Sequence, residues 1–235
     1  MPAIRCLVLL LAALIYAGHA SAERSRLTQE ADVVEAGNCE VESAGARERA
    51  RGKGPARESK LELNCGVGAS TEVSLLVARR RSDDGRELGV GLEGKTGLVP
   101  RRQAGIGWSL AYGLGRVREN TGPWRTAEHF VALEASHQVA TAWLLVAQLG
   151  TLRERIAQRD RTRWSLAAEH ALLAERLELK LELGGDDRDR PRRPQVGAAL
   201  RLTLWPDDFS LTLRYEAGPA PNRERRTALG LAYEF

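Results

Sequence analysis

The sequence has 235 residues, with 35 Lys and Arg side chains against 31 Asp and Glu and a formal net charge of +4 at pH 7. The two signs are interleaved along the chain, and lysine occurs only at positions 53, 60, 95 and 180. Nucleic-acid binding needs a concentrated basic surface. The near balance of interleaved acidic and basic residues therefore argues against a nucleic-acid partner, while another anionic partner stays possible.

The first 22 residues have the pattern of a secretory signal peptide. Arg5 precedes an apolar run over residues 7–17, and an A-x-A-like site ends at Ala22. The run is shorter than the roughly 20 apolar residues that a membrane-spanning helix needs. We expect cleavage after Ala22 and a mature protein outside the cytoplasm. Neither Cys6 nor Cys39 lies where a lipoprotein cleavage site would place its cysteine, so no lipid anchor is expected.

Two cysteines remain after cleavage, Cys39 and Cys65. A pair of cysteines in an oxidising compartment usually forms a disulfide. Closing this loop should contribute roughly 3 to 4 kcal/mol on the chain-entropy model. A metal or redox role is disfavoured because no third ligand lies nearby in the sequence. The expected segments are the signal peptide (1–22), an N-terminal periplasmic segment or plug (23–38) and a β-barrel (39–235).

From Cys39 onward, apolar and polar residues alternate with a period of two, which is typical of strands with two unlike faces. In the clearest run, ERLELKLEL, the leucines from 177 to 183 share one face and the charged residues the other. The runs lie, in chain order, near Val41 and at 61–65, 73–77, 88–92, 106–114, 126–137, 143–149, 164–168, 177–183, 196–204, 209–215 and 227–235.

These runs predict an antiparallel, up-and-down transmembrane β-barrel of twelve strands in the outer membrane. Several runs reach the 9 to 11 residues that a tilted strand needs to cross a bilayer. Polar connections such as RRRSDDGRE and GGDDRDRPRRP alternate with mostly short turns, as in outer-membrane barrels. Ten strands are the alternative if the Cys39 to Cys65 hairpin lies outside the sheet. A soluble periplasmic β-rich binding or scaffold protein is the main rival.

The register of the first hairpin follows from the cysteines. If Val41 faces Leu63, then Cys39 faces Cys65 on the outward face at the periplasmic rim. The same register places Glu42 opposite Glu62 in the lumen, a repulsion that needs a nearby arginine to offset it.

The last residues, GLAYEF, end in an alternating aromatic pattern with Tyr233 and Phe235. This ending resembles the C-terminal assembly signal of bacterial outer-membrane proteins. The resemblance implies recognition by the barrel-assembly machinery, with Phe235 as the main determinant. Closure of the barrel requires that the last strand pair with the first. The mature chain also loosely resembles uncharacterised exported proteins of proteobacteria, through ADVVEAGNCEVE and QVGAALRLTLWPDDFSLTLRYEAG. That likeness implies no known activity.

The inner face of the predicted barrel carries charges of both signs. Its most regular members are Glu178, Lys180, Glu182, Arg201, Arg214 and Glu216. Two interpretations stay open: a lumen filled by paired side chains, and a narrow polar channel or binding site. The glycines at 105, 107, 113 and 115 indicate barrel curvature or close approach of a neighbouring group.

No catalytic residue, metal ligand or cofactor is predicted. His129 and His137 are eight residues apart, about 26 Å along a strand, which is too far to share a metal. Ser136 points to the face opposite His137, so the two cannot act as nucleophile and base within the strand. The expected role is passive: small-solute passage, binding or envelope structure. The Arg-rich connections RERIAQRDR and GGDDRDRPRRP would face lipopolysaccharide phosphates, which guanidinium groups suit well.

Overall fold

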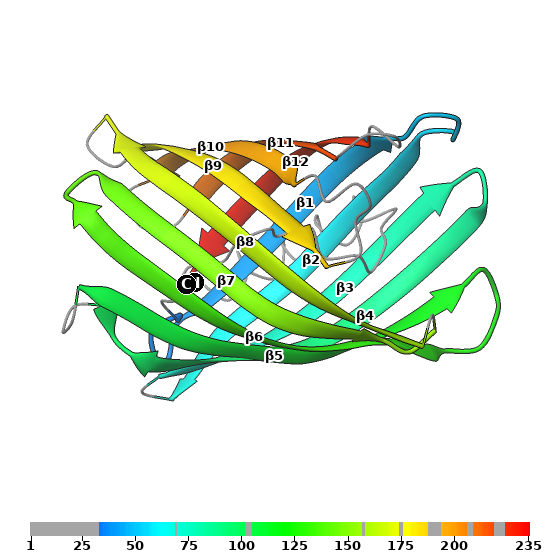
Figure 1. Ribbon diagram of the computed structural model, residues 1–235, viewed down its shortest axis with the longest axis horizontal. Helices are drawn as coiled ribbons and strands as arrows, with labels where there is room; N and C mark the ends of the chain where they lie inside the picture. Colours follow the sequence, from blue (N-terminus) through cyan, green and yellow to red (C-terminus); the bar gives the residue numbers. More distant parts are fainter. Residues whose placement is uncertain are drawn as a thin grey trace, which may run out of the picture.

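The computed structural model describes residues 33–68, 70–101, 105–156, 158–173, 176–187, 194–205, 209–218 and 224–235. These residues form one closed antiparallel β-barrel (Figure 1). The predicted signal peptide and most of the predicted N-terminal segment lie outside the described residues. No helix among the described residues is long and apolar enough to cross a membrane.

The twelve strands follow one another around the barrel, each paired with its neighbours in the chain. They are β1 (Cys39–Arg49), β2 (Ala56–Gly68), β3 (Thr71–Ser82), β4 (Gly85–Val99), β5 (Ile106–Glu119), β6 (Arg125–Ala140), β7 (Trp143–Glu154), β8 (Arg159–Leu172), β9 (Leu177–Asp186), β10 (Gln195–Trp205), β11 (Phe209–Ala217) and β12 (Arg225–Glu234). The prediction of twelve strands is confirmed. The ten-strand alternative is wrong, because β1 and β2 belong to the sheet.

The barrel closes where β1 pairs with β12. Val41 lies opposite Tyr233 in this pairing. The backbone N–H of Cys39 donates to the carbonyl of Phe235 at 2.9 Å, and the N–H of Phe235 donates to the carbonyl of Cys39 at 2.8 Å. Closure leaves no open sheet edge, which is the condition for a sheet in hydrocarbon.

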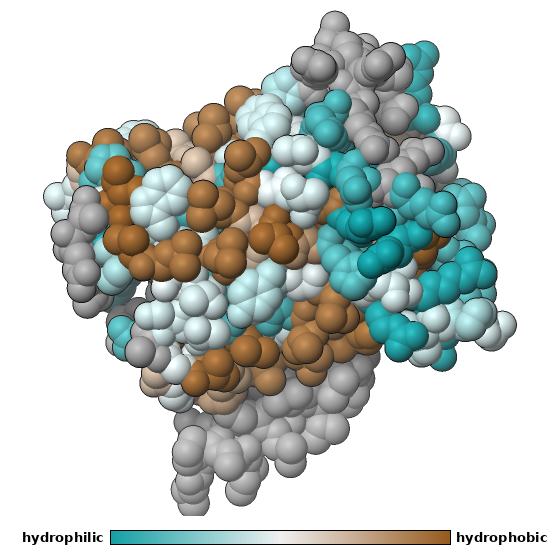
Figure 2. All heavy atoms as spheres, turned by 60° about the horizontal axis from the view of Figure 1, so that its bottom comes forward, coloured by the Kyte–Doolittle hydropathy of each residue, from teal (hydrophilic) through white to brown (hydrophobic). Residues whose placement is uncertain are grey.

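The alternation sorts apolar side chains to the outside. On β3, Leu75 is 53% exposed, whereas its neighbours Ser74 and Leu76 are 5% and 6% exposed. Figure 2 shows the hydrophobic surface spread over the middle and left of the barrel, with hydrophilic side chains gathered at the right-hand end. An outward apolar belt of this extent suits lipid hydrocarbon and not water. The structure therefore favours the outer-membrane location over the soluble alternative.

The two rims differ. We call the rim that holds Cys39 and Phe235, at the left of Figure 1, the terminal rim, and the opposite one the loop rim. In outer-membrane barrels the chain ends and short turns face the periplasm, so the loop rim faces outward. The strands reach further toward the loop rim than the sequence predicts. The segment RRRSDDGRE is not a long loop, because β3 and β4 continue until the turn formed by Asp83 and Asp84.

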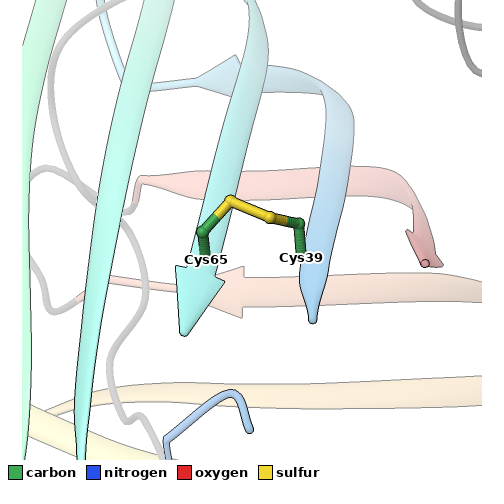
Figure 3. Close-up of a disulfide and its surroundings, with 2 residues drawn as sticks. All are labelled: Cys39 and Cys65. Atoms are coloured by element: carbon green, nitrogen blue, oxygen red, sulfur yellow. A yellow bond between two sulfur atoms is a disulfide. The ribbon is translucent and has the colours of Figure 1, made fainter. Parts of the chain in front are cut away.

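The predicted register of the first hairpin is confirmed, with Cys39 opposite Cys65 and Val41 opposite Leu63. The two cysteines form a disulfide with their Cα atoms 4.2 Å apart (Figure 3). Glu62 lies opposite Glu42, as expected. Glu62 forms an ion pair with Lys60, on the same strand.

Candidate functional site

An ion-pair chain runs around one wall of the lumen, starting on β8. The ammonium group of Lys180 on β9 lies 2.6 Å from the carboxylate of Glu169 and 3.5 Å from that of Glu182. The guanidinium group of Arg214 on β11 lies 3.5 Å from the carboxylate of Glu182. Glu169 and Glu182 are both buried. Charges of opposite sign therefore alternate across four strands at a depth where an isolated charge would be costly.

The ion-pair chain continues toward the loop rim. Arg214 also contacts Glu216 at 3.5 Å, and Arg226 on β12 contacts Glu216 at 3.9 Å. The other guanidinium nitrogen of Arg226 donates to Glu58 on β2 at 2.8 Å. Next to it, Arg80 on β3 pairs with Glu48 on β1 at 3.0 Å. The ion-pair chain thus connects β8 to β2 past the seam where the barrel closes, and Arg80 lies opposite Glu58 in the register of β2 and β3.

Small residues on β10 make this arrangement possible. Ala199 lies between Lys180 and Arg214 in the register, and Gly197 lies between Glu182 and Glu216. Both small residues are buried. Because neither projects a long side chain into the lumen, Arg214 reaches across β10 to Glu182.

Four of the six predicted lumen charges, Lys180, Glu182, Arg214 and Glu216, meet in the ion-pair chain. The other two lie nearer the terminal rim. Glu178 faces Arg201 across β9 and β10, and Arg201 donates to the hydroxyl of Ser210 at 3.2 Å.

Sequence reasoning missed Glu58, Arg80 and Glu48, which lie in strand ends taken for loops. The signal was present, because Glu58 continues the two-residue period of Lys60 and Glu62.

The opposite wall carries a row of hydrogen bonds at mid-height. The hydroxyl of Ser109 on β5 donates to Glu134 on β6 at 3.0 Å, and the amide of Gln148 on β7 donates to the other oxygen of Glu134 at 2.9 Å. Ser165 on β8 donates to Gln148 at 3.4 Å. Ser109 and Glu134 have no measurable exposure. This row fixes the lumen-facing side chains of four strands in one network.

The glycines of β5 allow neighbouring groups to approach closely, as one of the two interpretations expected. A side chain on Gly113 would collide with the ring of Phe130, which lies opposite it on β6. One on Gly115 would meet Glu128 at 3.2 Å. At Gly113 and Gly115, the space that the glycines leave is therefore taken by side chains of β6.

A cavity of about 380 Å³ occupies the part of the lumen nearer the loop rim. Its acids outnumber its bases, six to four. The charged residues lining it are Glu48, Glu58, Glu128, Asp186, Glu216, Glu224, Lys53, Arg80, Arg163 and Arg226. Phe130 and Trp164 also contribute to the lining. The cavity can hold a small polar molecule, with side chains of both signs around it.

At the terminal rim, residues 33–38 fold back against the lumen face of β2. The backbone N–H of Val34 donates to the lumen carboxylate of Glu72 at 3.0 Å. The N–H of Gly37 donates to the carbonyl of Gly66 at 3.1 Å. A side chain on Gly66 would collide with the backbone of Val34 and Glu35. These described residues of the predicted N-terminal segment thus lie against the lumen side of β2 and β3 at the terminal rim.

His137 and His170 contact backbone carbonyls near the terminal rim. The Nδ1 atom of His137 lies 2.6 Å from the carbonyl of Gly105, and that of His170 lies 3.1 Å from the carbonyl of Ala142. The ring of His170 also stacks on Trp143 with centroids 4.3 Å apart. Within the described parts of the chain, no three His, Cys, Asp or Glu side chains gather as metal ligands do.

The predicted assembly residues lie at the end of the last strand, Tyr233 within β12 and Phe235 directly after it. The rings of Tyr233 and Phe235 stack with centroids 5.9 Å apart, and Phe235 is exposed. Their role in assembly stays a prediction.

A closed barrel of twelve antiparallel strands, apolar outside and charged inside, defines the class of outer-membrane β-barrels. A family model matches residues 10–231. The chain belongs to that family, which is described as uncharacterised conserved protein UCP029691. A comparison with curated protein sequences finds no match.

Solved structures share the fold. The KdgM porin in complex with disordered oligogalacturonate matches with a TM-score of 0.60 and 10% identity, over 83% of this chain and 99% of the porin. An outer-membrane channel from Pseudomonas putida F1 matches with a TM-score of 0.62 and 10% identity, over 92% and 100% of the two chains. The β domain of the Bordetella autotransporter BrkA matches with a TM-score of 0.52 and 16% identity, over 86% and 100%.

Proposed function

We propose that the protein is a passive outer-membrane channel for small polar solutes that are neutral or carry both charges. The observation that carries the proposal is the cavity at the loop rim, whose lining combines six acids with four bases. Zwitterionic and neutral solutes can bind complementary groups there, whereas a lining with charges of only one sign would repel solutes of the same sign. The ion-pair chain keeps the wall rigid and balanced around them.

The lining argues against a polyanion as the preferred solute. The KdgM porin was solved with an oligogalacturonate, which is a chain of carboxylates. In the cavity of the present protein, the acids of the lining exceed the bases, and Arg226 is already paired with Glu58 and Glu216. We therefore expect weak selectivity for cations and no preference for acidic sugars.

The channel is tested by reconstituting the mature protein into planar bilayers and into liposomes. We expect discrete conductance steps, a reversal potential that shows weak cation preference, and liposome swelling that is faster with glycine or a neutral monosaccharide than with galacturonate. If the folded protein gives neither conductance nor swelling, the channel proposal is wrong and an envelope-structural role takes its place. Faster swelling with galacturonate would contradict the proposed selectivity.

We propose that residues 33–38 restrict this channel at its terminal mouth, and Gly66 offers a test. Gly66→Ala should displace Val34 and Glu35, because the new methyl group would occupy their backbone positions. Single-channel conductance should therefore rise. Gly68→Ala is the matched control, since nothing lies within 4 Å of its added side chain. Equal conductance in the two variants would show that the segment does not restrict passage.

We also propose that Phe235 is read by the barrel-assembly machinery. Deleting it removes both the ring and the two closing hydrogen bonds with Cys39, whereas Phe235→Ala removes the ring alone. The alanine variant should insert poorly in cells yet refold normally in detergent. Normal insertion of Phe235→Ala in cells would rule out recognition through the ring.

A further inference from the structure

Two arginines share the lumen face of β8 but differ in their partners. Arg161 contacts Glu154 at 3.2 Å and Asp186 at 3.3 Å. Arg163, two residues nearer the terminal rim, is half-buried, and it forms no ion pair and no side-chain hydrogen bond with any residue that the structure describes. A charge that is partly removed from water is costly unless it has a counterion. Arg163 therefore favours an anionic group from outside the protein.

The strand register explains why Arg163 is left without an acid. On β7 the residue opposite is Gly150, which has no side chain to offer. On β9 the residue opposite is Asp186, but the carboxylate of Asp186 is bound by Arg161. Arg163 also lines the cavity near the loop rim. The space next to its guanidinium group is therefore open to a solute.

Uncharged groups flank Arg163 within this cavity. Phe130 on β6 lies opposite Leu152 on β7, and both side chains contribute to the lining. On the side toward the terminal rim, the hydroxyl of Ser165 donates to Gln148 at 3.4 Å, and both residues line the cavity. A solute whose carboxylate binds Arg163 would thus have an apolar surface beside it for a small aliphatic part.

The charge of the whole lining is different from that of Arg163. Acids exceed bases, six to four. Two of the bases, Arg80 and Arg226, form ion pairs with acids of the lining, and Lys53 is exposed in the β1–β2 turn. The excess of acids attracts an ammonium group and disfavours a solute that carries only negative charge. A solute with one carboxylate and one ammonium group satisfies both conditions.

A guanidinium group binds a carboxylate through two parallel N–H donors. We propose that Arg163 is the carboxylate-binding residue of the cavity and that it selects small zwitterionic solutes of the amino-acid type. The carboxylate binds Arg163, and the ammonium group is held by the acidic lining. This inference rests on the proposed function, because the binding site lies in the cavity that supports the channel, but binding can be measured without any conductance.

The test is solute binding, measured by saturation-transfer NMR on the folded mature protein in detergent. The probes are valine, valinol, which lacks the carboxylate, and isovalerate, which lacks the ammonium group. The variants are Arg163→Gln and Arg163→Lys, of which the second keeps the charge but not the two parallel donors. The charge-matched control is Arg153→Gln, on the outward face of β7, where the exposed arginine pairs with Asp160. Heat-modifiable mobility checks the folding of each variant.

We expect valine to bind the wild-type protein roughly tenfold more tightly than valinol or isovalerate, because each of these lacks one charged contact. Arg163→Gln should lose about tenfold in affinity for valine and little for valinol. Arg163→Lys should recover only part of the loss, and the control should stay within about twofold. Valinol or isovalerate binding as tightly as valine would overturn the proposal, and so would an equal loss in the control.

Failure of this inference differs from failure of the channel proposal. Conductance and liposome swelling with a neutral monosaccharide test passage, and neither needs a carboxylate-binding residue. If the wild-type protein conducts but binds valine no better than valinol, the channel stands and the role of Arg163 is wrong. If valine binding depends on Arg163 but no conductance is found, the channel is wrong and the binding site stands.

Discussion

The outer end of β2 places two neighbouring residues in opposite electrostatic settings. Glu58 points into the lumen and pairs with Arg226 at 2.8 Å. Arg57 points outward and lies between Arg47 and Arg81. Inside, every step of the ion-pair chain alternates in sign, whereas outside the same sign repeats over four strands. A lumen shut off from bulk water must balance charge with protein groups, whereas exposed side chains on the outward face keep much of their solvation.

The arginines of the lumen and those of the outward face have different structural roles, which the sequence alone does not distinguish. Arg214 and Arg226 hold strands together by reaching acids on other strands. Arg57 and Arg86 face like charges across the strand pairings, so their removal should not weaken the barrel. Substitutions on the two faces should therefore differ in stability and not only in binding.

The largest expected effect comes from breaking the ion-pair chain at its buried centre. Glu182 is 4% exposed and contacts both Lys180 and Arg214. Glu182→Gln leaves these two cations with less compensating charge, and we expect a loss of about 3 to 5 kcal/mol. Urea unfolding in detergent or lipid measures it. Asp160→Asn, which breaks an exposed pair with Arg153, is the control and should cost less than about 1 kcal/mol.

Removing the disulfide tests a contribution to stability that does not depend on the charged residues of the lumen or of the outward face. Cys39→Ser with Cys65→Ser should lower the free energy of unfolding by roughly 3 kcal/mol on the chain-entropy model. The cysteines lie beside the closing hydrogen bonds between Cys39 and Phe235. Reduced wild-type protein should unfold at the same urea concentration as the double variant. A variant as stable as the oxidised wild type would mean that strand pairing alone stabilises the terminal-rim end of β1 and β2.

A smaller effect is expected at Ala199, where the ion-pair chain crosses β10. Ala199→Leu inserts a side chain between Lys180 and Arg214, and overpacking of this kind costs about 1 to 3 kcal/mol. Ala198→Leu is the matched control, because residue 198 faces the opposite side of the strand. If both variants unfold alike, the close crossing over β10 does not matter for stability.

The strands can be predicted from the sequence where their outward face touches lipid. There one face is apolar, so the period of two is visible, and the strand count and the register of Cys39 with Cys65 follow. Near the loop rim neither face is apolar: β1 ends in GARER, with Gly45, Arg47 and Arg49 on the outward positions. Apolar and polar residues do not alternate there, so the sequence predicts loops where the structure has strand ends.

The same limit explains the residues that were missed. Glu48, Glu58 and Arg80 lie in those charged strand ends. The outward arginines at 47, 57, 81 and 86 come from four strands, and only the register between those strands aligns them. The pairing of Lys180, Glu182 and Arg214 likewise depends on the strand register, which places the small residue Ala199 between Lys180 and Arg214.

The most direct test compares one substitution on the two faces. Arg226→Gln and Arg57→Gln remove the same charge near the same rim, one from the lumen and one from the outward face. In bilayers of neutral lipid, we expect Arg226→Gln to lower the free energy of unfolding by about 2 kcal/mol or more. Arg57→Gln should stay within about 0.5 kcal/mol of the wild type or exceed it. Equal losses would contradict the account, since they would show that Arg57 on the outward face contributes as much to stability as a residue of the ion-pair chain.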